Sequence, residues 1–185
     1  NTLIVHLGEL PFIDPMDTST MHVWKVQNGI FGTHLPELEW NLQEDHWGVC
    51  DPNNGSYLDY MDTTLVSPQI PAGDEDTVTF RITHRWYTEP GYDTCRLVAR
   101  VNRGDWQAVS GFFSGSSPGW PEYIVEEWEL SGLSPGDVFD FGFAFSSDSM
   151  FSYYFGWDID HVIVMDNKPP VIEGIYGPTS VEDNG

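Results

Sequence analysis

The sequence predicts an all-β protein folded as a two-sheet antiparallel jelly-roll sandwich with an extended C-terminal tail. Short stretches of alternating apolar and polar residues recur along its 185 residues, and clusters of Gly, Pro, Asn and Asp separate them. No stretch shows a convincing helical period. Roughly eight or nine strands joined by such turns are typical of a sandwich or a jelly roll.

The first part of the chain predicts short strands and one long connection. Residues 2–7 and 22–26 have the composition of strands. Residues 30–45 show no clean period and are expected to connect elements. Residues 46–50 and 56–60 flank an Asp-Pro-Asn-Asn-Gly sequence, which is a strong turn signal.

Residues 77–87 and 95–101 show the clearest alternation of the chain. Apolar residues take one parity and are expected to face the core. The other parity carries arginines: Arg81, Arg85, Arg96 and Arg100. His84 lies on the inward parity and is expected to be a core residue whose ring nitrogens are hydrogen-bonded.

Residues 123–130 and 138–146 predict two further strands. Four phenylalanines share one face of the second and form an aromatic wall: Phe139, Phe141, Phe143 and Phe145.

Residues 155–165 predict a central strand, because both parities carry apolar side chains. Asp160 shares its parity with Val162 and Val164 and is expected on a largely buried side. A buried carboxylate needs a partner, either a cation or several N–H donors. The pattern alone leaves these two alternatives open.

The charge balance excludes some partners. Seven Lys and Arg residues stand against 29 Asp and Glu residues, a formal net charge of −22. Such a charge repels nucleic acid and anionic membrane surfaces. No apolar run is long enough to span a bilayer, so no membrane insertion is expected in this segment.

The termini and cysteines favour an exported protein. Because residue 1 is Asn1 rather than Met, a mature or excised segment is expected. Cys50 and Cys95 are predicted to form a single disulfide, and two buried free thiols are the alternative. The expected location is extracellular.

A set of motifs in a fixed order resembles the MAM-like jelly-roll module that accompanies immune-inhibitor-A-type metallopeptidases and occurs in secreted prokaryotic surface proteins. The resemblance covers about residues 10–166. The motifs are Asp14-Pro15-Met16-Asp17-Thr18, Trp24, Trp47, Tyr57, Leu65-Val66-Ser67-Pro68-Gln69-Ile70, Phe80, Tyr92-Asp93, Trp106, Trp120, Leu130, Phe143-Ala144-Phe145-Ser146-Ser147-Asp148 and Gly156-Trp157-Asp158-Ile159-Asp160. Residues 1–166 are accordingly expected to form the jelly roll. Residues 167–185 look like a linker and the first strand of a following PKD or Ig-like module.

The resemblance implies a non-catalytic module with a structural calcium ion. In such modules the ion joins the acidic start of the domain to the aspartate of the last strand, which implies Asp14, Asp17 and Asp160 as ligands. Carboxylate oxygens suit Ca²⁺. The chain departs from the family pattern at Asp158, where a neutral residue is usual, and at His161, where a second acid is usual.

The sequence contains no catalytic motif with a suitable context. It has no His-Glu-x-x-His, no Gly-x-Ser-x-Gly and no phosphate-binding glycine loop. Glu126, Glu127 and Glu129 offer carboxylates for glycoside hydrolysis, but a solvated strand face is the simpler interpretation. The protein is therefore not expected to be an enzyme.

Two surface features predict ligand binding. The loop before the last strand carries clustered aromatics that are expected to stack on sugars or anchor a partner, unless the loop folds back as a lid: Phe151, Tyr153, Tyr154 and Phe155. The four arginines would form a basic stripe for an acidic polysaccharide if their strands pair. Ion pairs with the protein's own acids are the alternative.

Taken together, these features predict a calcium-stabilised, non-catalytic adhesive or carbohydrate-binding module of a larger extracellular protein. Its expected partner is a glycan or another surface protein. The alternative is a structural subunit of a surface layer or filament that self-assembles through residues 171–185. A glycoside hydrolase is a more distant alternative.

Overall fold

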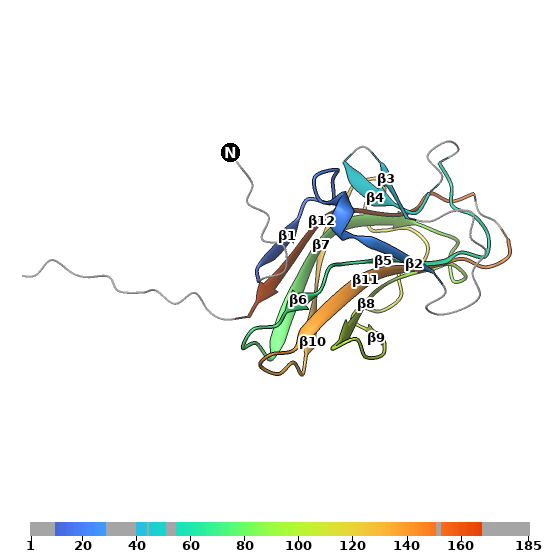
Figure 1. The fold of residues 1–185 in the computed structure, drawn as a ribbon. Helices are drawn as coiled ribbons and strands as arrows, with labels where there is room; N and C mark the ends of the chain where they lie inside the picture. The colour runs from blue at the N-terminus through green and yellow to red at the C-terminus, as the bar shows by residue number, and fades with distance from the viewer. Residues whose placement is uncertain (1–9, 29–39, 44, 51–54, 151–152, 168–185) are drawn as a thin grey trace, which may run out of the picture.

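The computed structural model describes residues 10–28, 40–43, 45–50, 55–150 and 153–167. These residues form one 3₁₀ turn, η1 (Met21–Val23), and otherwise strands and loops, with no α-helix in the described ranges (Figure 1). The strands are β1 (Phe12–Asp14), β2 (Lys25–Asn28), β3 (Asn41–Gln43), β4 (His46–Gly48), β5 (Asp62–Val66), β6 (Ile70–Pro71), β7 (Thr77–Tyr87), β8 (Thr94–Val101), β9 (Gln107–Ala108), β10 (Ile124–Ser131), β11 (Val138–Ser146) and β12 (Gly156–Asp166).

The strands form two six-stranded antiparallel sheets that pack face to face. The first sheet has the order β10-β7-β12-β4-β3, with β1 paired to β12. The second has the order β2-β5-β11-β8-β9, with β6 paired to β11. The predicted two-sheet antiparallel jelly roll is confirmed. The predicted strand at residues 2–7 lies outside the described residues, and so does the predicted tail at residues 167–185 apart from its first residue.

The core lies between the sheets, and its centre is the aromatic wall of β11. Phe139, Phe141, Phe143 and Phe145 are each at most 1% exposed. Phe80 of β7 meets Phe141 edge to face, with 5.1 Å between ring centroids, and Trp157 of β12 meets Phe143 at 5.5 Å. Burying each such side chain contributes about 1.5–3 kcal/mol, so this wall is a main source of stability.

His84 is a satisfied core residue, as the alternation predicts. Its ring is fully buried. Trp157 Nε1 donates to His84 Nδ1 at 3.0 Å, and His84 Nε2 lies 3.1 Å from Glu126 Oε2. Because Nδ1 accepts a hydrogen bond, Nε2 carries the proton and donates to the glutamate.

β12 contains a β-bulge at Asp160, so the predicted position of this side chain was wrong. The pairing with β7 skips this residue, between Ile159 and His161. The extra residue reverses the alternation, so Trp157 and Ile159 before the bulge and Val162 after it are all buried. Asp160 is half-buried, and the fully buried carboxylate belongs to Asp158. The prediction was wrong because a period-two pattern cannot show a bulge.

The predicted disulfide is wrong, since Cys50 and Cys95 are both free and buried. Gln43 Nε2 donates to Cys50 Sγ at 2.8 Å, which gives this thiol a partner beside β4. Cys95 lies in β8 within the apolar core, where burial raises the pKa of its thiol well above the usual value.

The predicted basic stripe is also wrong, because β7 and β8 lie in different sheets. In this jelly roll the chain passes from one sheet to the other after β7 instead of turning back to pair. Arg81 and Arg85 therefore lie on the outer face of the first sheet, and Arg96 and Arg100 lie on the outer face of the second.

No helix among the described residues is long and apolar enough to cross a membrane.

Candidate functional site

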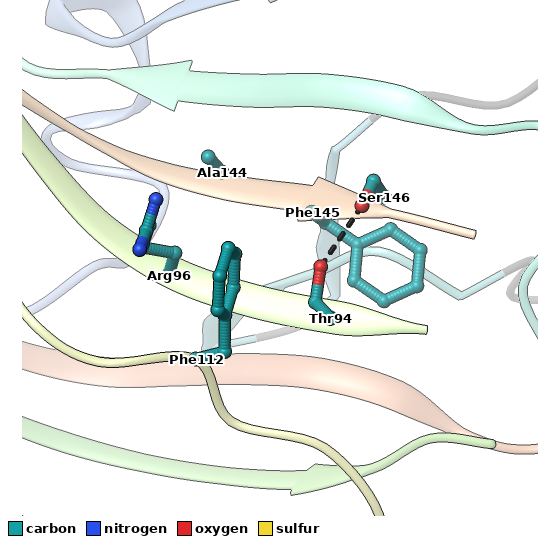
Figure 2. A pocket seen from close by; sticks show the side chains of 6 residues that line it. All are labelled: Thr94, Arg96, Phe112, Ala144, Phe145 and Ser146. Carbon is teal, nitrogen blue, oxygen red and sulfur yellow. Dashed lines mark hydrogen bonds between the residues drawn. The ribbon is translucent and has the colours of Figure 1, made fainter. Parts of the chain in front are cut away.

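A cavity of about 230 Å³ opens on the outer face of the second sheet, at the start of β8 and the end of β11 (Figure 2). We call it the Phe112 pocket. Its lining residues are Thr94, Arg96, Phe112, Ala144, Phe145 and Ser146.

Strand register brings most of the lining together. Thr94 pairs with Ser146 and Arg96 with Ala144, so these four side chains share the outward face of β8 and β11. Ala144 is short and leaves room opposite the long Arg96. The pocket therefore forms where a small residue of one strand pairs with a large residue of its neighbour.

Phe112 reaches the pocket from a loop that runs beside β8. Backbone hydrogen bonds of 2.9 Å join Phe113 and Cys95 in both directions. Phe113 packs against the core, and the alternation of an extended chain then turns Phe112 outward. The Phe112 side chain is 63% exposed.

The pocket combines an aromatic face, a guanidinium and two hydroxyls. Arg96 Cζ lies 3.7 Å from the Phe112 ring centroid, a close cation–π contact. Arg96 Nε is buried and makes no hydrogen bond with any described residue. The hydroxyl oxygens of Thr94 and Ser146 lie 2.9 Å apart, as the dashed line in Figure 2 marks. This set can stack on an apolar ring face and hydrogen-bond to hydroxyls.

An acidic triad lies at the same end of the sheet. One carboxylate oxygen each of Glu89, Asp93 and Asp148 lies within 4.8 Å of the others. Asp93 immediately precedes Thr94, and Asp148 follows Ser146 by two positions. The pocket and the triad are therefore neighbours along both strands.

Hydrogen bonds hold the triad in place from one side. Tyr57 Oη donates to Asp93, and the Asp148 backbone N–H donates to Asp93 Oδ1 at 2.8 Å. The Glu89 backbone N–H donates to Tyr57 Oη at 3.0 Å. The side chain of Glu89 has no such support, because its Oε2 is buried and has no hydrogen-bond partner among the described residues.

The triad is electrostatically unfavourable without a cation. Desolvation, and after it repulsion from Asp148, raises the pKa of Glu89 above its usual value. Desolvation also raises the pKa of Asp93, against the hydrogen bond from Tyr57. Burial and the nearby Asp93 raise the pKa of Tyr57. Clustered carboxylates with an unpartnered oxygen fit a hard cation such as Ca²⁺, so the triad could hold a metal ion.

The predicted calcium ligand Asp14 is instead satisfied by protein donors. It is fully buried at the end of β1. Both of its carboxylate oxygens accept hydrogen bonds, at distances of 2.6–2.8 Å, from the Met16 backbone N–H, Thr20 Oγ1 and Trp24 Nε1. Asp14 is therefore stabilised by N–H and O–H donors of the protein.

The structure does not bring the three predicted calcium ligands together. Asp17 Oδ1 accepts from the backbone N–H and the hydroxyl of Ser19, at 2.7 and 2.5 Å. Asp160 lies at the bulge of β12. Across the described ranges, only Glu89, Asp93 and Asp148 form a group with three ligand atoms this close.

The aromatic residues of the loop before β12 differ in exposure. Tyr153 is 87% exposed. Tyr154 packs edge to face on Tyr87 at 5.0 Å, and Phe155 packs on Trp120 at 5.1 Å, so these two rings lie back on the domain as a lid would. Phe151 lies outside the described residues.

Three of the four predicted arginines form ion pairs. Arg81 lies 3.6 Å from Glu127 and Arg85 lies 2.9 Å from Asp158. Arg100 Nη2 lies 2.7 Å from the buried Asp140. Arg96 has no ion pair with the described residues and stacks on Phe112 instead.

Arg85 and Asp158 form a buried network on the first sheet. Arg85 Nε and Nη2 both donate to Asp158 Oδ2, at 3.0 and 2.9 Å. Three rings surround the guanidinium at 4.4–5.5 Å: those of Trp120, Tyr123 and Phe155. Burial raises the pKa of Asp158, although His46 and Arg85 oppose the shift. A side chain at Gly48 would come within 2.6 Å of Asp158 Oδ1, so glycine makes room for this carboxylate.

Sequence reasoning missed Phe112 and the acidic triad. Phe112 lies in a segment with no period, and its partner Arg96 belongs to a different part of the chain. A signal for two of the acids was available, because Asp93 and Asp148 each lie two positions from the end of a predicted strand. Only the register of β8 against β11 shows that these two strand ends meet.

No protein-family profile and no curated protein matches the sequence. Solved structures match by fold. The xylan-binding domain CBM22-1 of Paenibacillus barcinonensis Xyn10C aligns with a TM-score of 0.50 and 9% identity, over 89% of this chain and 98% of that chain. A CBM35 from Paenibacillus barcinonensis aligns at 0.46 and 14% identity, over 83% and 97%. The C-terminal CBM6 of LamC from Zobellia galactanivorans aligns at 0.41 and 13%, over 77% and 99%. At 9% identity, the likeness to the CBM22-1 domain shows a shared jelly-roll fold.

Proposed function

We propose that this protein is a non-catalytic carbohydrate-binding module whose sugar site is the Phe112 pocket. The observation that carries the proposal is the exposed Phe112 ring, fixed on Arg96 beside two hydroxyls in a cavity. An exposed aromatic ring gains free energy when its apolar surface is buried. The apolar face of a sugar ring can stack on it and bury that surface. The guanidinium and hydroxyls match the hydroxyls of a sugar.

The size of the pocket suits one ring of a longer chain. Its volume is about 230 Å³. Complete small-molecule sites have roughly 300–1,000 Å³, so this cavity would enclose part of a polysaccharide and leave the rest on the sheet face. The xylan-binding domain that shares the fold makes xylan a reasonable first ligand to test.

The proposal includes a calcium ion at the acidic triad. It is supported by the three converging carboxylates and by Glu89 Oε2, which has no hydrogen-bond partner within the described ranges. The ion would tie the loop before β8 to the loop after β11. Because Thr94 and Ser146 follow and precede those loops, it would also order the end of the Phe112 pocket.

The proposed sugar and calcium sites also indicate the location and the partner of the protein. A glycan-binding module with a calcium site fits an extracellular location, with a glycan or another surface protein as its partner. The MAM-like resemblance, the next module at residues 167–185 and assembly through residues 171–185 stay predictions. Residues 168–185 lie outside the described part of the chain.

Affinity electrophoresis through gels that contain xylan, a mixed-linkage glucan or no polysaccharide tests the proposal. We expect slower migration of the protein in at least one polysaccharide gel, and normal migration of the Phe112→Ala variant in that gel. Unchanged migration of the wild-type protein in these gels and in an array of neutral and acidic glycans would contradict carbohydrate binding.

A further inference from the structure

A second pocket of about 450 Å³ opens on the outer face of the second sheet, between β2, β5, β8 and β11. We call it the Lys25 pocket. Three of the seven Lys and Arg residues of the chain line it: Lys25, Arg100 and Arg103. The other polar residues that line it are Gln27, Ser67, Gln69 and Asp140.

Two of these three cations have no anionic partner in the part of the chain that the structure describes. Arg100 donates to Asp140 through Nε at 3.0 Å and through Nη2 at 2.7 Å, so this pair is close to neutral. Lys25 and Arg103 have no carboxylate within 4.0 Å among the described residues. The one hydrogen bond of the Arg103 side chain with those residues is a long contact of 3.5 Å to Gln69 Oε1.

This absence is unexpected for the composition of the protein. Acids outnumber basic residues 29 to 7, so a cation on a random part of the surface easily finds a carboxylate. Arg81, Arg85 and Arg100 each do so, and Arg96, which forms no ion pair with the described residues, stacks on Phe112 instead. Because Asp140 pairs with Arg100, Lys25 and Arg103 leave the pocket with an excess of positively charged side chains on a molecule of net charge −22.

The fold holds Arg103 at the pocket. Asn102 and Arg103 form the turn after β8, both with left-handed backbone angles (φ 53° and 61°) that non-glycine residues rarely adopt. Asn102 Nδ2 donates to Asp137 Oδ1 at 2.7 Å, and the Val138 N–H donates to Asn102 Oδ1 at 3.2 Å. A turn clamped in this way fixes where the Arg103 side chain begins.

The two pockets lie along the same strands. Arg96 lines the Phe112 pocket and Arg100 lines the Lys25 pocket, four positions further on β8. Four residues of antiparallel strand span about 13–14 Å. The ring of Trp106 lies between these positions on the same face, 4.4 Å from Arg100 Cζ. A ligand that reaches from one pocket to the other is a chain of several sugar units.

We propose that the Lys25 pocket binds the acidic group of a polysaccharide, a carboxylate or a sulfate, so that the ligand of this protein is an anionic polysaccharide lying along β8 and β11. The proposal rests on the Phe112 pocket as a sugar site. It adds that Lys25 and Arg103 select the acidic chain over a neutral one. An anion between these two side chains would accept charge-assisted hydrogen bonds.

Isothermal titration calorimetry with three polymers tests the proposal: polygalacturonate for the carboxylate, a sulfated galactan for the sulfate, and xylan as the neutral reference. The proteins are the wild type, Lys25→Gln, Arg103→Gln and the double variant, each at low and at physiological ionic strength. Arg81→Gln is the matched control, because it removes one positive charge from an exposed side chain on the other sheet.

We expect at least one acidic polymer to bind more tightly than xylan, with an affinity that falls as salt rises. Each single variant weakens that binding about tenfold, the size of one lost charge-assisted hydrogen bond. The control changes it less than about twofold, because Arg81 lies on β7 of the other sheet and not in the Lys25 pocket. Binding of xylan is unchanged in all variants. The polymer that responds shows whether the acidic group is a carboxylate or a sulfate.

Two outcomes would overturn the inference. The proposed function survives the first outcome and fails in the second. If xylan binds and both acidic polymers bind no better, or if Arg81→Gln weakens binding as much as Lys25→Gln does, the Lys25 pocket is not an anion site although the sugar site stands. If none of the three polymers binds, the proposed function fails and the inference fails with it.

Discussion

Thr94 and Ser146 place their hydroxyl oxygens 2.9 Å apart where β8 pairs with β11, and this contact separates the two halves of the candidate site. On one side lies the Phe112 pocket. On the other side lie Asp93 and Asp148, each within two residues of the hydroxyl pair. The acidic triad and the end of the pocket are therefore adjacent on both strands.

The calcium proposal predicts opposite effects of one substitution with and without the ion. Glu89→Gln removes one of the three charges, and the Oε2 atom that it alters has no hydrogen bond to a described residue. Without calcium we expect the melting temperature to stay the same or rise, because repulsion is relieved. With calcium we expect a smaller stabilisation than in the wild type, because one ligand is weakened. Differential scanning calorimetry with EDTA and with a calcium titration measures both.

Glu129→Gln is the control for this experiment, because Glu129 is exposed on β10 of the first sheet. It should respond to calcium as the wild type does. A wild-type melting temperature that is unaffected by EDTA and by added calcium would contradict a calcium ion in the fold.

The triad also predicts how stability depends on pH in the calcium-free protein. The raised pKa values of Glu89 and Asp93 mean that the folded state binds their protons more tightly than the unfolded state does. Their contribution to the free energy of unfolding therefore rises as pH falls through the raised pKa values, and it levels off near the usual carboxyl pKa of about 4. Urea unfolding between neutral pH and that value measures it.

Because the other acids of the chain also titrate, this test compares variants. Glu89→Gln should show a weaker rise of stability with falling pH than the wild type or Glu129→Gln. Identical profiles of all three proteins would show that the triad does not carry the effect.

The buried pair of Arg85 and Asp158 predicts a large loss of stability when the cation is removed. Arg85→Met leaves Asp158 fully buried without its two hydrogen bonds from the guanidinium. We expect a cost of about 3 kcal/mol in the free energy of unfolding, as for other broken buried pairs. Arg81→Met removes an exposed pair at 3.6 Å and should cost at most about 0.5 kcal/mol. Equal costs in chemical denaturation would contradict this assignment.

The free cysteines predict that stability does not depend on the redox state. A reducing agent should leave the melting temperature unchanged, since Cys50 and Cys95 are not bridged. Both thiols should react with Ellman's reagent quickly after unfolding and slowly before it, because both are buried. Loss of stability on reduction, or the absence of free thiols in the unfolded protein, would show that Cys50 and Cys95 form a disulfide after all.

Alternation predicted the fold class because it reports directly which face of a strand is buried. It correctly identified the aromatic wall of β11 and the core position of His84. It could not assign a strand to a sheet, so Arg81 and Arg96 were expected on one face although they lie on opposite faces of the sandwich. It could not detect the extra residue at Asp160 either, and the buried carboxylate proved to be Asp158.

The candidate site was less predictable, since its residues come together only through strand pairing. Arg96 was expected at a binding surface, and it lies in the Phe112 pocket. Phe112 itself was not expected, because a loop of irregular sequence carries it. The clustered aromatics before β12 drew attention instead, yet Tyr154 packs back on the domain.

Calorimetric titration of Phe112→Ala and Tyr153→Ala with the polysaccharide that binds best tests the central claim most directly. Both substitutions remove one exposed aromatic ring, at 63% and 87% exposure, so neither should lower the melting temperature appreciably. The account predicts that Phe112→Ala weakens binding about tenfold or more, in line with loss of a ring stacked against its ligand, and that Tyr153→Ala binds as the wild type does. Full binding by Phe112→Ala, or loss of binding by Tyr153→Ala alone, would contradict the assignment of the sugar site to the Phe112 pocket.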